Sequence, residues 1–179
     1  MVKIVFVCLG NICRSPLAEA SFRKLVQEHR LAHHFEINSA GTAGYHIGKR
    51  PDRRALEVLE EKGIETGHLG KKLSAADLDF YDHIVVMDEQ NFEDVHNLYH
   101  STKKVPPAPD KVFLIRDYDP EVRGVQEVPD PYYENIEEFR KVYDIVDRSN
   151  AALLDMLVDK YNLEPMDEED ESEEDTSDK

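Results

Sequence analysis

Short apolar runs alternate with amphipathic stretches along most of the chain. Four runs rich in β-branched residues are typical of buried strands, over residues 3–7, 35–39, 83–87 and 111–115. Around them, apolar residues recur at helical spacing over residues 17–26, 51–64, 88–99 and 136–157. Strands separated by helices imply a parallel sheet covered on both faces, so the pattern predicts a three-layer α/β fold with a four-stranded parallel sheet.

Local signals mark the ends of two of these helices. Pro16 suits the first turn of a helix, and Ser15 just before it is a candidate for the N-cap. Pro51 is expected to open the second helix and Gly63 to stop it. The stretch 127–135, which contains two prolines, is expected to be a loop.

The net charge of −16 is concentrated at the C-terminus. Residues 164–179 contain ten acidic residues and one lysine, which leaves −7 for the other residues. This segment has almost nothing apolar to bury, so the sequence predicts one domain over residues 1–163 and a disordered acidic tail over residues 164–179. No extended basic face is expected, and nucleic acid is therefore not an expected partner.

The cysteine count and the apolar runs indicate the compartment. Two cysteines in 179 residues do not make a disulfide framework. The first apolar run is too short for a secretory signal, and no stretch approaches the roughly 20 apolar residues of a membrane span. We therefore expect a cytoplasmic protein without membrane insertion.

The stretch "VCLGNICRSP" follows the first predicted strand and leads into the first predicted helix. Ligands of parallel α/β sheets bind at this edge. Gly10 and Asn11 tolerate positive φ angles, so the backbone N–H groups can form an anion nest, and the helix start adds positive partial charge. Arg14 matches two phosphate oxygens, and the same surroundings favour the nucleophilic thiolate of Cys8. The loop predicts a phosphate site with a nucleophile beneath it.

Each cysteine also has a plainer interpretation, because free cysteine is among the most buried residue types. For Cys8, the glycine, arginine and helix start in register with it outweigh that interpretation. For Cys13 two readings stay open, since a second thiol beside a reactive one is either packing or a redox partner.

A second candidate lies in the proline-flanked loop. Asp130 stands between Pro129 and Pro131, and two tyrosines follow it. If the phosphate at this site is an ester of a phenol, the phenolate leaves poorly, because the pKa of phenol is about 10. A general acid within reach typically accelerates its departure by about 10²–10⁴-fold. Asp130 is therefore a candidate acid, although aspartate is also common in plain turns.

The opening motif resembles the signature of the low-molecular-weight protein tyrosine phosphatases, a cysteine followed by five residues and an arginine. Further segments appear in the order that this family shows: "INSAGT" (37–42), "RPDRRA" (50–55), "GIETGH" (63–68), "VVMDEQN" (85–91) and "VPDPYYEN" (128–135). The resemblance covers about residues 2–160. It implies a flavodoxin-like fold of the phosphotyrosine phosphatase I type.

The resemblance also implies residue roles. Cys8 is the nucleophile that forms phosphocysteine, Arg14 binds phosphate, and Asp130 is general acid and base, with no metal or other cofactor. The implied substrate-binding residues are Leu9, Gly10, Asn11, Ile12, Cys13, Ser15, Tyr45 and Tyr132. Leu9, Tyr45 and Tyr132 are expected to wall the cleft, and Ser15 to support the thiolate. Ser39 and His68 are expected to hold the loop together with Asn11.

The implied substrates are phosphotyrosine-containing proteins, with inorganic phosphate as product, and a monomer or weak dimer is expected. Three relatives of this loop remain as alternatives. Arginine phosphatases share nearly everything but resemble a version with threonine at the position of Ile12. Arsenate reductases need further cysteines that this chain lacks, and a phosphocysteine carrier needs no general acid.

Overall fold

The computed structural model of the chain describes residues 1–167. The strands are β1 (Val2–Cys8), β2 (Phe35–Gly41), β3 (His83–Val86) and β4 (Val112–Leu114). The α-helices are α1 (Arg14–Glu28), α2 (Arg53–Glu61), α3 (Ala75–Phe80), α4 (Glu89–Lys103) and α5 (Ile136–Tyr161). Two short 3₁₀ helices, η1 (Ala32–His34) and η2 (Ile115–Tyr118), complete the described elements.

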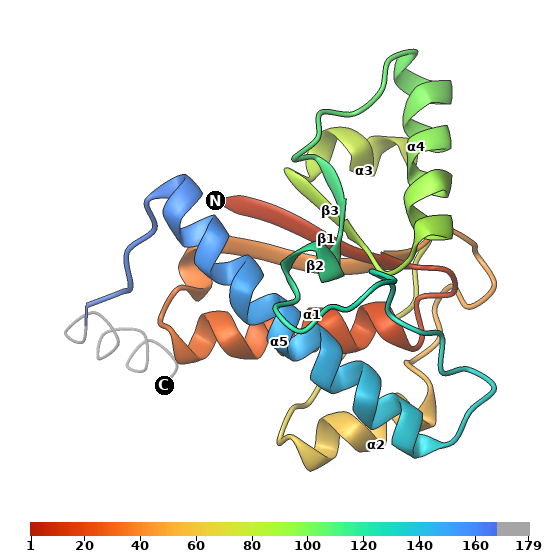
Figure 1. The fold of residues 1–179 in the computed structure, drawn as a ribbon, viewed down its shortest axis with the longest axis vertical. Helices are drawn as coiled ribbons and strands as arrows, with labels where there is room; N and C mark the ends of the chain where they lie inside the picture. The colour runs from red at the N-terminus through yellow and green to blue at the C-terminus, as the bar shows by residue number, and fades with distance from the viewer. Residues whose placement is uncertain (168–179) are drawn as a thin grey trace, which may run out of the picture.

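The four strands pair in the order β2-β1-β3-β4, and every pairing is parallel. Helices α1, α2 and α5 lie on one side of the sheet and α3 and α4 on the other (Figure 1). The predicted fold class, a three-layer α/β fold with a four-stranded parallel sheet, is thereby confirmed.

The central strand β1 explains why its sequence is apolar without interruption. Ile4, Phe6 and Cys8 pack into the core shared with α1 and α5, whereas Val5 and Val7 pack into the core beneath α3 and α4. A strand that is buried on both faces has no solvent-exposed face, so apolar residues occupy successive positions. The alternation also directs the side chain of Cys8 toward the layer that contains α1.

The predicted starts of helices α1 and α2 are wrong. Ser15 is not the cap of α1: the N-cap position is Cys13, which makes no side-chain capping bond, and Ser15 lies inside the first turn. Its hydroxyl instead lies 3.0 Å from Sγ of Cys8 and accepts a hydrogen bond from Nδ2 of Asn11 at 2.8 Å. Helix α2 begins at Arg53 with Asp52 as its cap, two residues after Pro51, while Gly63 takes a positive φ of 69° just beyond its end.

Helix α3 was not expected from the apolar pattern. It has six residues, too few for an apolar stripe, but its start carries a capping box in which Ser74 and Asp77 bond to each other's backbone N–H. Helix α4 starts after its cap Asp88 and runs to Lys103, four residues beyond the predicted end.

The first residues of the acidic segment run beside η1. The carbonyl of Glu164 lies 2.8 Å from Nε2 of His34, and the N–H of Met166 donates to the carbonyl of Arg30 at 2.9 Å. Residues 168–179 lie outside the described residues, so the predicted disordered tail stays a prediction. Among residues 1–167, no helix has the length and apolar character to cross a membrane.

Candidate active site

The loop between β1 and α1, residues 8–14, is called the phosphate loop below. Its first side chain is almost fully covered, since Cys8 is 3% exposed. The Sγ of Cys8 accepts a hydrogen bond from the N–H of Asn11 at 3.3 Å and lies 3.0 Å from Oγ of Ser15. The Asn11 N–H stabilises negative charge on the sulfur, and the Ser15 hydroxyl is placed to donate to a thiolate there.

Asn11 holds the loop in shape through every polar atom of its side chain. Its Nδ2 donates to Ser15 Oγ at 2.8 Å and to Ser39 Oγ at 3.0 Å. Its Oδ1 lies 2.9 Å from Nε2 of His68 and accepts from the N–H of Lys71 at 3.0 Å. The backbone φ of Asn11 is 58°, a left-handed conformation that costs free energy and needs such support.

The glycine beside it plays a different part from the one expected. Gly10 does not take a positive φ. A Cβ built on Gly10 would meet Cδ2 of His46 at 3.1 Å, which is tighter than ordinary packing. Any larger residue at position 10 would push the His46 ring away by a few tenths of an ångström.

Glu19, which the sequence patterns do not single out, is a buried carboxylate behind the loop. Its Oε2 accepts from Ser39 Oγ at 2.6 Å and lies 3.2 Å from Nδ1 of His68, and Arg23 donates to Oε1 at 3.0 Å. Burial lowers the pKa of His68, and the carboxylate of Glu19 acts against it. Ser39 and His68, both expected to hold the loop, do contact Asn11. A glutamate in an otherwise apolar helical stripe was the available signal.

Arg14 is directed into the site by groups from two other segments. Its Nη1 donates to Asp88 Oδ2 at 2.6 Å and to the carbonyl of Val128 at 3.1 Å, while Nη2 lies 3.6 Å from Asp130 Oδ2. Burial opposes the charge, but Cys8 and Asp88 outweigh it and raise the pKa of Arg14. Asp88, which also caps α4, was not among the expected site residues.

Asp130 lies on the loop of residues 128–135, called the acid loop below. Its side chain is 49% exposed, and its Oδ1 accepts from the N–H of Tyr132 at 3.1 Å. The second oxygen faces Arg14 across the site. The structure therefore brings Asp130 to the phosphate loop, 116 positions from Arg14 along the sequence.

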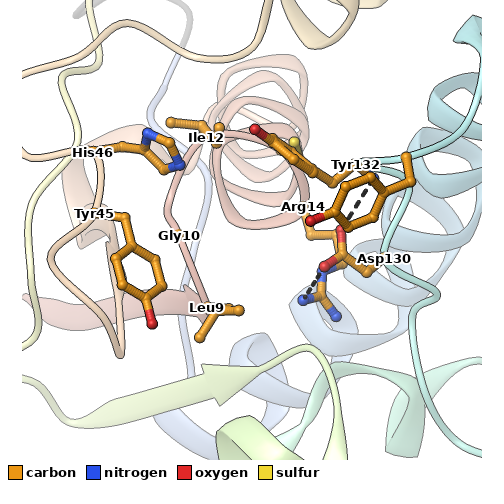
Figure 2. Close-up of a pocket in the computed structure, with 10 residues that line it drawn as sticks. Leu9, Gly10, Ile12, Arg14, Tyr45, His46, Asp130 and Tyr132 are labelled. Carbon is orange, nitrogen blue, oxygen red and sulfur yellow. Dashed lines mark hydrogen bonds and ion pairs between the residues drawn. The ribbon is translucent and has the colours of Figure 1, made fainter.

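A pocket of about 340 Å³ opens between the two loops. Its lining comprises Leu9, Gly10, Ile12, Cys13, Arg14, Tyr45, His46, Asp130, Tyr132 and Tyr133. Figure 2 shows Leu9, Tyr45 and His46 on one side and Asp130 and Tyr132 on the other. The walls predicted from the family resemblance therefore line one pocket, and His46 is an addition to them. An apolar slot with an arginine and a carboxylate at one end suits an aryl phosphate.

The second cysteine differs from the first in its surroundings. Burial, followed by the charge of Asp52, raises the pKa of Cys13 far above that of an ordinary thiol. Cys13 is therefore a protonated thiol, which fits the packing reading better than a reactive one. Within residues 1–167, no group of three histidine, cysteine or carboxylate side chains is arranged to hold a metal ion.

Comparison with known proteins extends the similarity to the whole domain. A family model described as low molecular weight phosphotyrosine protein phosphatase matches residues 3–163. The protein of that name from Homo sapiens is 38% identical over 153 residues, which cover 86% of this chain and 94% of the relative. The one from Schizosaccharomyces pombe is 42% identical over 155 residues, covering 85% and 95%.

Solved structures share the fold with equal coverage. A protein tyrosine phosphatase from Entamoeba histolytica superposes with a TM-score of 0.81 at 33% identity, covering 90% of this chain and 99% of that one. A Drosophila arginine phosphatase superposes with a TM-score of 0.80 at 30% identity, covering 87% and 98%. Two substrate classes therefore occur on closely similar folds.

Proposed function

Because the chain belongs to the low molecular weight phosphotyrosine protein phosphatase family, we propose that it hydrolyses phosphotyrosine in proteins through a phosphocysteine on Cys8. The observation that carries the proposal is that Arg14 and Asp130 line one pocket, while the covered thiol of Cys8 begins the loop that carries Arg14 and is near enough to raise the pKa of Arg14. No metal is required, because the charge of the phosphate is met by Arg14 and by backbone N–H groups.

In the first step the thiolate of Cys8 attacks phosphorus in line with the phenolic oxygen. The sulfur–phosphorus bond forms, the oxygen–phosphorus bond breaks, and protonated Asp130 gives its proton to the departing phenolate. Arg14 supplies two N–H donors to the equatorial oxygens, where charge is spread during phosphoryl transfer. Its contact with Asp88 fixes the guanidinium before substrate arrives.

In the second step the carboxylate of Asp130 takes a proton from water, and the water oxygen attacks phosphorus. The sulfur–phosphorus bond breaks and inorganic phosphate forms. The Ser15 hydroxyl at 3.0 Å and the Asn11 N–H at 3.3 Å stabilise the thiolate as it leaves. The network around Asn11, Ser39 and His68 keeps these donors in place.

The pocket walls favour a flat, long side chain. Leu9, Tyr45 and Tyr132 present apolar and aromatic surface to a phenyl ring, which gains from stacking and burial. A phosphoserine side chain is too short to carry its phosphorus to the covered sulfur of Cys8, and its alkoxide leaves less readily than a phenolate. We therefore propose phosphotyrosine over phosphoserine.

A second candidate is hydrolysis of phosphoarginine, which the similarity to a Drosophila arginine phosphatase favours. Phosphoarginine is long enough to reach Cys8, so depth does not exclude it. Ile12, which lines the pocket, offers no hydroxyl to a guanidinium, whereas a threonine there would. One side chain supplies about 1–3 kcal/mol of discrimination, or roughly 10–200-fold.

The test for substrate class compares kcat/KM on matched phosphotyrosine and phosphoarginine peptides for the parent protein and for Ile12→Thr. We expect the parent to prefer phosphotyrosine and the variant to shift toward phosphoarginine. A parent that prefers phosphoarginine overturns the tyrosine assignment. If the ratio of the two kcat/KM values is the same in the variant as in the parent, Ile12 does not determine the preference. Turnover in the presence of a metal chelator, with phosphocysteine trapped by rapid acid quench, tests the chemistry itself.

The remaining expectations about this chain stay predictions. They are a cytoplasmic location, a monomer or weak dimer, phosphoproteins rather than nucleic acid as partners, and a disordered tail. Arsenate reduction is disfavoured because the chain has only two cysteines. A phosphocysteine carrier is disfavoured because it needs no general acid, whereas Asp130 lies beside Arg14.

A further inference from the structure

An arginine outside the pocket lining connects the two loops of the site. Arg54 belongs to the first turn of α2. Its Nε and Nη2 donate to the two carboxylate oxygens of Asp52 at 3.0 and 2.9 Å. The backbone N–H of Asp52 in turn donates to the carbonyl of Ile12 at 2.7 Å. The guanidinium is therefore anchored, through Asp52, to the phosphate loop.

The same guanidinium also contacts the acid loop, through Nη2 and Nη1. Nη2 donates to the carbonyl of Tyr132 at 2.9 Å, and Nη1 donates to the carbonyl of Glu134. The plane of Arg54 also covers the ring of Phe139 at 4.4 Å from the ring centre. Both accepting carbonyls follow Asp130 closely, and the N–H of Tyr132 is the group that holds the Asp130 carboxylate.

We propose that Arg54 is a positioning residue that holds the acid loop in register with the phosphate loop, so that Asp130 reaches the leaving oxygen. The proposal rests on the proposed function of Asp130 as general acid. Arg54 does not itself line the pocket and bonds only to the backbone of Tyr132 there, so we expect its effect to pass through the position of Asp130. A lysine cannot replace it, because one ammonium cannot engage two carboxylate oxygens and two carbonyls in a plane.

The expected signature is a dependence on the leaving group. Arg54→Ala should lower kcat/KM on phosphotyrosine by about 10–100-fold, part of the 10²–10⁴-fold that a general acid contributes. On p-nitrophenyl phosphate, whose phenol is far more acidic, the loss should be less than about threefold, because protonation of the leaving group contributes little there. Arg54→Lys should fall between the parent and Arg54→Ala on phosphotyrosine.

Arg53 provides a matched control on the same helical turn. It is exposed, and its side chain makes no hydrogen bond or ion pair within residues 1–167. Arg53→Ala removes the same charge from the same surface, so it should change neither rate. Competitive inhibition by inorganic phosphate and the Tm of each variant report whether the phosphate loop and the fold are intact.

A double-mutant cycle separates positioning from a general structural role. If Arg54 acts through Asp130, the Asp130→Ala, Arg54→Ala double variant should be no slower on phosphotyrosine than Asp130→Ala alone. Additive losses, or equal losses of Arg54→Ala on both substrates, overturn the proposal. If Arg54→Ala fails to fold, the same cycle with Arg54→Lys decides.

The cycle also distinguishes failure of this proposal from failure of the proposed function. If Asp130→Ala shows no dependence on the leaving group, the general-acid assignment is wrong and the positioning role falls with it. If Asp130→Ala behaves as expected but Arg54→Ala does not, only the role of Arg54 is overturned.

Discussion

The phosphate loop and the acid loop serve the same pocket but are held in different ways. The Arg14 side chain is 4% exposed and that of Asp130 is 49% exposed. The phosphate loop has a buried side chain of its own as its centre, because Asn11 connects it to Ser15, Ser39 and His68, in addition to backbone hydrogen bonds at its carbonyls. The acid loop is held mainly through its backbone carbonyls, by Arg14 at Val128 and by Arg54 at Tyr132.

This difference matches the tasks that we propose for the two loops. The transferred phosphoryl group is the same for every substrate, and a preorganised, buried set of donors is worth most where charge develops. The leaving group differs in position from one substrate to another. A carboxylate on an exposed loop, with the backbone fixed and Oδ2 3.6 Å from Nη2 of Arg14, fits that requirement.

The largest effect should come from removing the nucleophile of the phosphate loop. In Cys8→Ser the thiolate is replaced by a hydroxyl that stays protonated, so turnover of both phosphotyrosine and p-nitrophenyl phosphate should fall to background. Arg14 and the loop N–H groups remain, so the variant should still bind inorganic phosphate by calorimetry. Retained turnover would show that phosphate is transferred by another route.

The acid loop should respond in a different way. Asp130→Ala should lower kcat/KM on phosphotyrosine by about 10²–10⁴-fold and on p-nitrophenyl phosphate much less, because the second leaving group needs little help. Steady-state kinetics on a series of aryl phosphates measure this as a steeper dependence on leaving-group pKa. Equal losses across the series would make Asp130 a structural residue.

Substitution of Asn11, whose side chain holds the phosphate loop, should have a smaller effect than loss of the nucleophile Cys8 but a larger one than substitution of a surface residue. Asn11→Gly keeps the left-handed backbone and removes the amide, so Ser39 and His68 each lose one of their buried partners and keep only Glu19, at a cost of about 1–3 kcal/mol. Asn11→Ala adds the strain of φ 58°. We expect urea unfolding to rank the parent above Asn11→Gly and Asn11→Gly above Asn11→Ala. Equal stability of the two variants would mean that the backbone strain is negligible.

The two loops also differ in how far the sequence predicts them. Cys8, Asn11 and Arg14 lie within the same short stretch of chain, residues 8–14, and a strand, a helix start and their spacing suffice to place them together. The flanking prolines and the family resemblance together predict the role of Asp130. Arg54, whose guanidinium contacts the acid loop, lies 76 positions away in the sequence. The sequence does not predict the roles of Asp88 and Arg54, because a charged side chain that reaches across the fold leaves no trace in the periodic pattern.

The smallest effect concerns Asp52, whose backbone contacts the phosphate loop and whose carboxylate holds Arg54. Burial opposes its charge, but hydrogen bonds from Arg54 hold the pKa of Asp52 below its ordinary value of 3.8. A depressed carboxyl pKa adds stability above the unfolded value, and this stability is lost as pH falls through the folded value.

Asp52→Asn should isolate that charge, because asparagine still caps α2. At neutral pH we expect the variant to unfold about 0.5–1.5 kcal/mol more easily than the parent in urea. The difference should persist down to about pH 3.8 and then shrink, because the parent loses the same charge as Asp52 becomes protonated. Asp79→Asn, which removes an exposed partner of Lys103, should change stability little at any pH. A gap that stays constant below pH 3.8 would assign the cost to the amide itself, and the charge of Asp52 would then contribute nothing to holding the acid loop.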